Sequence, residues 1–218
     1  MSDQNKSLNR RSFIHYASAA FVLPVVGIGA LELIGCASPD SFHLETASGD
    51  GGSGVGPWRI TIASDKEPGE PLVVSGTIYA PDGRTPMKGI SLFVYQTDAT
   101  GRYSAGGNGD NRNTRLHGQM WTNAEGRYEF RTIKPAAYPG RTDAAHIHAY
   151  VSGPGYPEYW IDEYQFEDDP LVREELRRRN SGKGTFSAIL KLTRDSDGVL
   201  RGVRDIKIER CSNNCTGR

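Results

Sequence analysis

Residues 118–135, GQMWTNAEGRYEFRTIKP, give the clearest indication of the fold. Two β-rich runs flank the segment Asn123-Ala124-Glu125-Gly126, and Tyr128 and Phe130 alternate with charged residues in the second run. Alternation of apolar and polar residues is typical of a strand with one buried face, and Asn and Gly favour turns. The stretch therefore predicts two strands joined by a tight, hairpin-like turn.

Similar short runs make up most of the chain after residue 58. They are β-rich, are punctuated by Gly, Pro, Asn and Asp, and cover residues 71–83, 89–104, 145–155, 184–198 and 199–209. Only residues 170–180, PLVREELRRRN, favour a helix. The pattern predicts an all-β domain over residues 59–210, an antiparallel β-sandwich with long connecting loops and little helix.

Two of the five histidines of the chain stand two residues apart, in the run AHIHAYV. On a strand, His146 and His148 point to the same face while Ile147 packs on the other. Two imidazoles on one face can bind one metal ion, but a half-exposed strand can also carry such a pair without a metal, so further ligands are needed. Carboxylates are available at Asp143, Asp162 and Glu163.

Two tyrosines differ from the others in their position. Tyr103 follows a strand-like run, in GRYS, and Tyr138 lies in the turn PAAYPG directly before the histidine run. By contrast, Tyr128 alternates with Phe130 as a core residue would. A phenolate oxygen is a hard anionic donor that favours Fe(III), and imidazole also binds iron.

The chain resembles the intradiol ring-cleavage dioxygenases, in particular the catalytic sandwich of the protocatechuate- and catechol-type enzymes. The likeness runs from about Val74 to Pro170, through GTIYAPDGRTPMKGISLFVYQTDATGRYS, TNAEGRYEFRTIKPAAYPGR, AHIHAYVSGPG and QFEDDP. The resemblance implies a non-haem Fe(III) cofactor and a catechol-type substrate. It also implies ring cleavage by O2 between the two hydroxylated carbons, with both oxygen atoms entering a muconate-type diacid.

The resemblance also implies the iron ligands. They would be Tyr103, at the G-x-Y-S-like position, Tyr138, at the P-x-x-Y turn, and the pair His146 and His148. Tyr138 would be the ligand that the substrate displaces, and it would help to take up a substrate proton. Arg141 is the nearest counterpart of an arginine that stabilises charge developing on the ring.

This sequence departs from the family pattern at several positions. Well-known members have their arginine three residues before the first histidine, where this chain has Asp143. Glu163 stands where the family often has a glutamine, and Gly140 where some members have a tryptophan. Arg141 can equally be a solvated loop residue, and the particular catechol does not follow from the sequence.

Two other interpretations remain open. The first is a non-catalytic, lipid-anchored β-sandwich that serves as a binding or structural module, like transthyretin-like domains. The second is a zinc or copper hydrolase that uses His146, His148 and a carboxylate such as Asp162. A binding module does not require Tyr103 and Tyr138 to meet the histidines, and a hydrolase leaves both tyrosines unexplained.

Residues 1–35 predict a signal peptide rather than part of the fold. Asn9-Arg10-Arg11-Ser12-Phe13-Ile14 is a twin-arginine pattern, and an apolar run follows it. Leu33-Ile34-Gly35-Cys36 resembles a bacterial lipobox, which predicts a lipid on Cys36 and an exported lipoprotein of the cell envelope. The alternative to a signal peptide is a buried N-terminal helix. The alternative to lipidation is simple cleavage of the leader near Cys36. Residues 36–58 are rich in Gly, Ser and Asp and predict a flexible tether.

Charge and cysteine content limit the partners. Lys plus Arg and Asp plus Glu each number 26, so nothing indicates electrostatic attraction to nucleic acid. The expected partners are a small catechol-type molecule, O2 and, through Cys36, a membrane. Cys211 and Cys215 lie in the C-terminal tail, residues 211–218, and could pair in an oxidising compartment.

Overall fold

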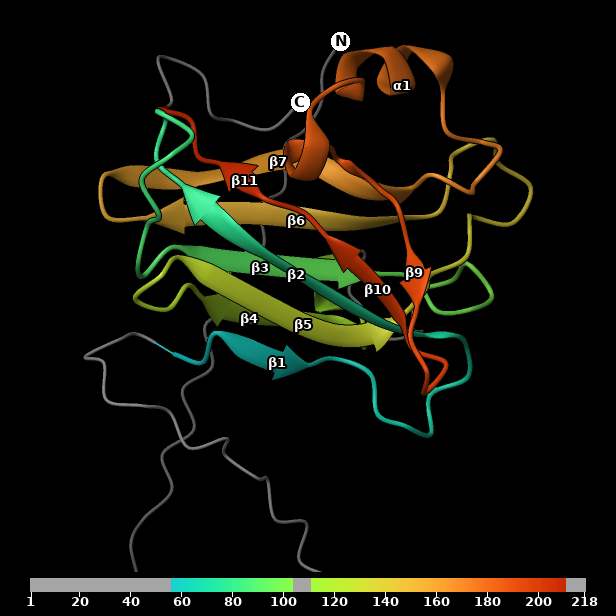
Figure 1. The fold of residues 1–218 in the computed structure, drawn as a ribbon. Helices are drawn as coiled ribbons and strands as arrows, with labels where there is room; N and C mark the ends of the chain where they lie inside the picture. Colours follow the sequence, from blue (N-terminus) through green and yellow to red (C-terminus); the bar gives the residue numbers. More distant parts are fainter. Residues whose placement is uncertain (1–55, 104–110, 211–218) are drawn as a thin grey trace, which may run out of the picture. The chain divides into compact units, whose positions relative to one another are not determined.

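The computed structural model describes residues 56–103 and 111–210. The predicted signal peptide, Cys36, nearly all of the tether, and the tail with Cys211 and Cys215 lie outside these residues. Within them the chain forms two β-sheets that face each other, with one short α-helix at their edge (Figure 1). The predicted all-β sandwich with little helix is therefore confirmed. No helix in the described part of the chain is both long enough and apolar enough to span a membrane.

The first sheet has the strand order β1-β5-β2-β10-β9, with β11 pairing with β2 as well. Its strands are β1 (Arg59–Thr61), β2 (Pro71–Tyr79), β5 (Arg127–Ile133), β9 (Thr193–Arg194), β10 (Leu200–Val203) and β11 (Ile206–Lys207). The second sheet has the order β4-β3-β6-β7-β8. It contains β3 (Ser91–Gln96), β4 (His117–Trp121), β6 (His146–Gly153), β7 (Tyr156–Phe166) and β8 (Ile189–Leu190).

The stretch 118–135 does form two strands and a tight turn, but the strands belong to different sheets. Asn123 N–H donates to the Arg127 carbonyl, and the Asn123 side chain accepts from the N–H groups of Glu125 and Arg127. Beyond this turn β4 pairs with β3, whereas β5 pairs with β2 and β1. The hairpin-like pairing is therefore wrong: Met120 and Phe130 are both fully buried, and they enter one core from opposite sheets.

The antiparallel prediction holds for the pairs between long strands and for the short pair β9 with β10, but four other pairs contradict it. β1 with β5, β10 with β2, β11 with β2, and β7 with β8 are parallel pairs. Each includes a strand of two to four residues. Such pairs join segments far apart in the sequence, so local patterns carry no information about their direction.

The core lies between the two sheets and is made by alternate residues of each. Its fully buried members include Leu72, Val74, Ile78 and Phe130 from the first sheet and Leu92, Val94, Ile147 and Ala149 from the second. Burial of each larger side chain contributes about 1.5–3 kcal/mol, so this layer fixes β6 firmly. The predicted helix is shorter than expected, since α1 covers only Glu174–Asn180. Its Leu176 packs with Val172 and Ala144, next to the start of β6.

Candidate metal centre

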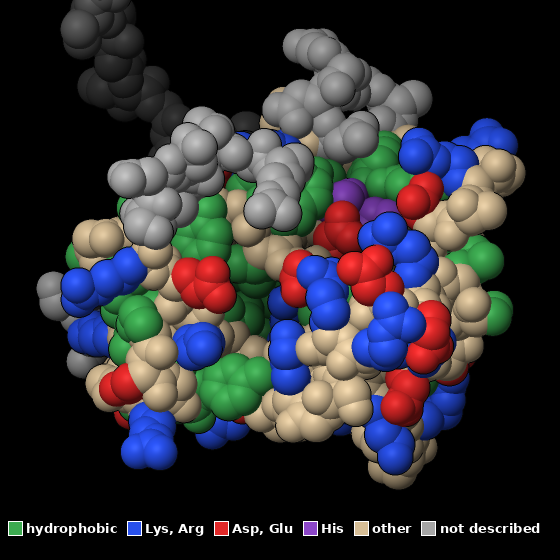
Figure 2. Space-filling view, turned by 90° about the horizontal axis from the view of Figure 1, so that it is seen from above, with side chains coloured by type: hydrophobic (Ala, Val, Ile, Leu, Met, Phe, Trp, Pro, Cys, Tyr) green, Lys and Arg blue, Asp and Glu red, His purple; other side chains and the backbone are tan. Residues whose placement is uncertain are grey.

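The two histidines of β6 point away from the core, as the strand alternation predicts. Ile147 between them is fully buried, whereas the imidazoles of His146 and His148 lie together on the other face, with their Nε2 atoms 3.1 Å apart. His148 is buried and His146 half-buried. Histidine side chains reach the surface in Figure 2, beside acidic and hydrophobic side chains.

The two predicted tyrosines join this pair. The Tyr138 hydroxyl lies 3.2 Å from Nε2 of His146 and 3.3 Å from Nε2 of His148. The Tyr103 hydroxyl lies 2.9 Å from Nε2 of His148 and 2.6 Å from the Tyr138 hydroxyl. Two phenol oxygens and two imidazole nitrogens from three separate segments therefore converge on one point.

The loops that carry the tyrosines are tied to each other. Asp98 organises the loop after β3, since its carboxylate accepts from the N–H groups of Thr100 and Arg102. Ala136, in the loop between β5 and β6, donates its N–H to the Asp98 carbonyl and accepts from the Thr97 hydroxyl. These bonds fix the segment before Tyr103 against the segment before Tyr138.

A glycine permits this close approach. Gly101 has a φ of +76°, and a Cβ at that position would lie 1.9 Å from the carbonyl oxygen of Ala137. Any other residue would force the two loops apart, because real Cβ atoms essentially never come closer than 3.0 Å to such an atom. Gly101 is therefore required where the two tyrosine loops meet.

The separations of the four donor atoms suit one bound metal ion. Donors bound at about 2.0–2.1 Å, with angles between a right angle and the tetrahedral angle, lie about 2.9–3.4 Å apart. Four of the separations, 2.9, 3.1, 3.2 and 3.3 Å, lie in this range. The fifth, 2.6 Å between the two tyrosine hydroxyls, is a short hydrogen bond.

The protonation pattern also favours a cation. His146 Nδ1 lies 2.6 Å from the Ala144 carbonyl, which can only accept, so Nδ1 carries the proton and Nε2 presents a lone pair to the centre. Burial lowers the pKa of His148, which keeps that ring neutral. Burial likewise raises the pKa of both Tyr103 and Tyr138, so their phenolates are unfavourable without a positive ion. A multivalent cation would reverse that preference.

His148 is held by aromatic rings on both sides and by a carboxylate behind it. Tyr95 stacks on the imidazole at 4.5 Å, and Trp160 meets it edge-on at 4.8 Å. Glu163 Oε1 lies 3.3 Å from Nδ1, without the alignment of a good hydrogen bond. Burial opposes ionisation of Glu163, but His148, His146 and Gln165 together outweigh burial, so the pKa of the carboxyl lies below its ordinary value.

A bulge in β7 decides which carboxylate faces the histidines. Ile147 pairs with Tyr164 and Ala149 with Ile161, so one extra residue is inserted in β7 opposite His148. Glu163 consequently joins His146 and His148, with its ligand atom and theirs within 4.8 Å of one another. Asp162 instead lines a cavity with Tyr159 and Ile161, which belong to the core-facing side of β7. The Asp162 ligand of the hydrolase interpretation is therefore wrong.

Arg141 lies close to the centre but does not enter it. Its guanidinium carbon is 5.4 Å from the Tyr138 ring, its Nε pairs with Asp143 at 2.9 Å, and its side chain is 66% exposed. Asp143 therefore pairs with Arg141 at the surface and does not contact the two histidines. Sequence analysis missed Asp98, Tyr95 and Trp160. Only Asp98 carried a signal, the turn-forming Asp-Ala-Thr-Gly.

Comparison with known proteins gives one consistent result. A family model described as "Dioxygenase" matches residues 57–202. The chain belongs to the intradiol ring-cleavage dioxygenase family. This family member is 31% identical to catechol 1,2-dioxygenase 1 of Acinetobacter lwoffii over 135 residues, which are 54% of the chain and 42% of that relative. It is 35% identical to the protocatechuate 3,4-dioxygenase beta chain of Burkholderia cepacia over 115 residues, 48% of each.

Solved structures of intradiol dioxygenases have the same fold. The dioxygenase domain of a dioxygenase–carbohydrate-binding protein fusion from Streptomyces sp. SirexAA-E superposes with a TM-score of 0.54 at 25% identity, over 72% of this chain and 91% of that one. The intradiol ring-cleavage dioxygenase of Tetranychus urticae superposes with a TM-score of 0.54 at 20% identity, over 75% of this chain and 92% of that one. The present family member spans about half the length of the first two relatives.

Proposed function

We propose that this chain is a non-haem Fe(III) dioxygenase that cleaves a catechol-type ring with O2 between the two hydroxylated carbons. The product would be a muconate-type diacid. The observation that carries the proposal is the convergence of two phenol oxygens and two imidazole Nε2 atoms, joined by five separations of 2.6–3.3 Å. Membership of the family supports the same reaction.

Tyr103, Tyr138, His146 and His148 would hold the iron. When bound, Fe(III) would supply a Lewis acid that both oxygens of a catechol can chelate, which would make the ring reactive toward O2. The Ala144 carbonyl fixes the tautomer of His146, and burial keeps the imidazole of His148 neutral. Tyr95 and Trp160 enclose His148 and exclude water from that side.

Tyr138 would accept a proton from the substrate. It lies in an exposed turn, where Arg141 N–H donates to the Tyr138 carbonyl, rather than on a strand. Its hydroxyl also contacts every other member of the set. A phenolate released there could take a catechol proton without disturbing the β6 core. The exposed Arg141 guanidinium lies next to the Tyr138 ring. It would stabilise the negative charge that develops on a bound catecholate.

The visible absorption spectrum of the iron-loaded protein, before and after anaerobic addition of catechol, tests this proposal. Tyrosinate bound to Fe(III) should give a reddish charge-transfer band that shifts when catechol chelates. Tyr103→Phe and Tyr138→Phe should each weaken or shift the band. Tyr150→Phe should not, because Tyr150 packs on Trp160 and Tyr95 outside the donor set. A colourless protein that retains no iron would instead favour the non-catalytic binding module.

We further propose export and lipid anchoring through Cys36. The support is the twin-arginine pattern and the lipobox-like Leu33-Ile34-Gly35-Cys36 of the sequence. Such an enzyme would meet catechols outside the cytoplasm. Growth and muconate formation compared with and without the leader would test where the activity is needed.

A further inference from the structure

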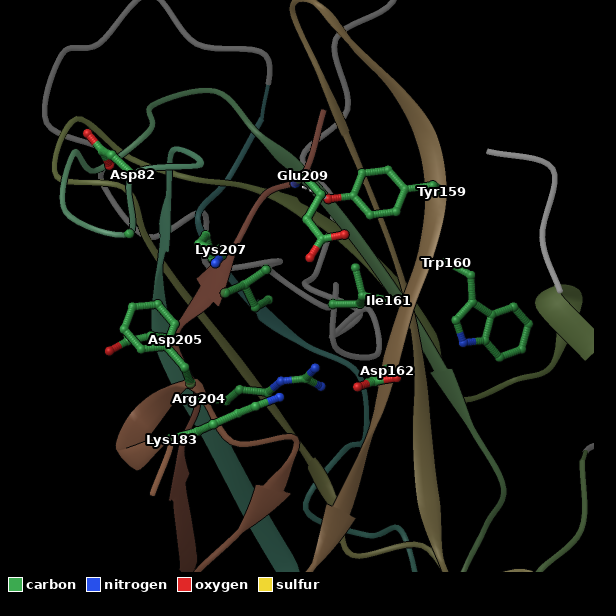
Figure 3. Close-up of a pocket in the computed structure, with 13 residues that line it drawn as sticks. Asp82, Tyr159, Trp160, Ile161, Asp162, Lys183, Arg204, Asp205, Lys207 and Glu209 are labelled. Carbon is green, nitrogen blue, oxygen red and sulfur yellow. Dashed lines mark hydrogen bonds between the residues drawn. The ribbon is translucent and has the colours of Figure 1, made fainter. Parts of the chain in front are cut away.

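The cavity that Asp162 lines lies on the other side of β7 from the histidines. It has a volume of about 620 Å³, within the range of small-molecule sites. Figure 3 shows it between β7 and the chain around β11, with Tyr159 and Ile161 pointing in from β7 and Trp160 pointing away. Phe186 adds a third apolar side chain, and Lys183, Arg204 and Lys207 add positive charge.

Arg204 is the unusual residue of this cavity. Its side chain extends into the space that Figure 3 displays, yet the residue is only 5% exposed. Among the described residues, its Nε and Nη1 atoms are buried without a hydrogen-bond partner. A buried guanidinium that has lost water and gained no anion is strongly unfavourable, so the arrangement indicates a missing partner.

The guanidinium is held in place before any ligand arrives. Its central carbon lies 4.3 Å from the centre of the Tyr164 ring. The Tyr164 and Tyr128 hydroxyls are hydrogen-bonded to each other, with their oxygens 3.0 Å apart. The Tyr128 hydroxyl donates to the Arg204 carbonyl at 2.6 Å, and Arg204 N–H donates to Ser75. A ring against the flat face of a guanidinium leaves its edge donors free for an oxyanion. The donors are therefore preorganised, which reduces the entropic cost of binding.

The carboxylates of the cavity do not satisfy Arg204. Asp82 accepts from Thr85 and Arg84 in its own turn, and Asp205 accepts from the N–H of Thr77. Asp162 and Glu209 are exposed, and neither hydrogen-bonds Nε or Nη1 of the arginine. An incoming anion must therefore compete with nearby negative charge. An apolar body that packs on the aromatic side chains would supply the additional affinity.

We propose that this cavity binds a small organic carboxylate with an apolar body. The carboxylate would accept hydrogen bonds from Arg204, and the apolar body would lie against Tyr159, Ile161 and Phe186. This site is separate from the metal centre, because Tyr159 and Ile161 of β7 lie on the core-facing side of the second sheet and His148 lies on its other face. It needs no bound iron and takes no part in ring cleavage.

Titration calorimetry of the iron-loaded protein with phenylacetate tests the proposal, with its neutral amide and inorganic phosphate as comparison ligands. Phenylacetate should bind at least tenfold more tightly than either one, without changing the visible band of the metal centre. Arg204→Met removes the charge but keeps apolar volume, and should weaken phenylacetate at least tenfold. Lys88→Met, at an exposed position outside the cavity lining, should change affinity less than threefold.

Each other outcome overturns the proposal. If the amide binds as tightly as phenylacetate, the site does not recognise a carboxylate. If phosphate binds as tightly as phenylacetate, the site does not recognise an apolar body. A shift of the visible band, or wild-type affinity in Arg204→Met, would place the ligand elsewhere. If Arg204→Met does not fold, Phe186→Ala replaces it, because Phe186 is 36% exposed and outside the main core. That variant should weaken phenylacetate at least threefold, and unchanged affinity would contradict the site.

Discussion

Substitution of Gly101 by alanine should break the metal centre without unfolding the sandwich. The new Cβ would lie 1.9 Å from the Ala137 carbonyl oxygen, and 3.0 Å is the shortest ordinary approach. The two loops must therefore separate by about 1.1 Å, the difference between these values. Gly101 precedes Tyr103 by two residues and Ala137 adjoins Tyr138, so the shift acts directly on hydroxyls now 2.6 Å apart.

The expected effects of Gly101→Ala follow from that displacement. A misplacement of about 1 Å can cost about a hundredfold in rate, so catechol turnover should fall by roughly that factor. Iron affinity should fall by about 10- to 100-fold, as for other changes that disturb the support of metal ligands. Far-UV circular dichroism should stay unchanged, because the core between the sheets is not touched.

Gly140→Ala is the matched control. Gly140 has a nearly identical φ of +73°, but a Cβ there meets nothing within 4 Å. Both variants carry the strain of a left-handed alanine, about 1–2 kcal/mol, and only Gly101→Ala carries the clash. Gly140→Ala should therefore lose stability in urea unfolding but keep the iron band. The reasoning is refuted if Gly101→Ala retains wild-type iron affinity, or if Gly140→Ala loses it equally.

Three further predictions concern the surroundings of the site, a surface turn and the leader. Glu163→Gln removes a negative charge beside His148, so the charge-transfer band should move to longer wavelength; an unchanged band would mean that Glu163 does not act on the iron. Hydrogen bonds from the Thr85 side chain and then from the Thr85 and Arg84 N–H groups lower the pKa of Asp82 to about 2, from an ordinary value of 3.8. Asp82→Ala should therefore reduce the free energy of unfolding above pH 3.8, and the difference should vanish as the pH falls toward 2. If the two proteins still differ in the free energy of unfolding near pH 2, the ionised Asp82 carboxylate is not the source of the stability. Cys36→Ser should move the protein from the membrane to the soluble fraction of the envelope, and fractionation that leaves it in the membrane would exclude lipid on Cys36 as the anchor.

The sequence was sufficient for the strands but not for their partners. Alternation in 127–133 predicted a half-buried strand, and β5 occupies those residues. Local alternation does not say which sheet a strand joins, so the turn at Asn123 was interpreted as hairpin-like although it connects two sheets. The parallel pairing of β10 with β2 depends on residues more than a hundred positions apart and leaves no local signature.

The candidate metal centre was predicted partly from residue spacing and partly from the family resemblance. Strand alternation placed His146 and His148 on one face, whereas the resemblance singled out Tyr103 and Tyr138 as ligands; their hydroxyls do lie beside the imidazoles. The choice of Glu163 over Asp162 depends on a bulge in β7, which no pattern in the sequence marks. The role of Trp160 is likewise set by packing across the sheet.

Reaction of the iron-loaded protein with catechol under isotopically labelled dioxygen tests the central claim most directly. Mass analysis of the product should show a ring-opened muconate-type diacid that carries both labelled oxygen atoms, and Tyr138→Phe should reduce its formation. A product that carries one labelled atom or none, or recovery of the intact ring with iron demonstrably bound, would contradict the account.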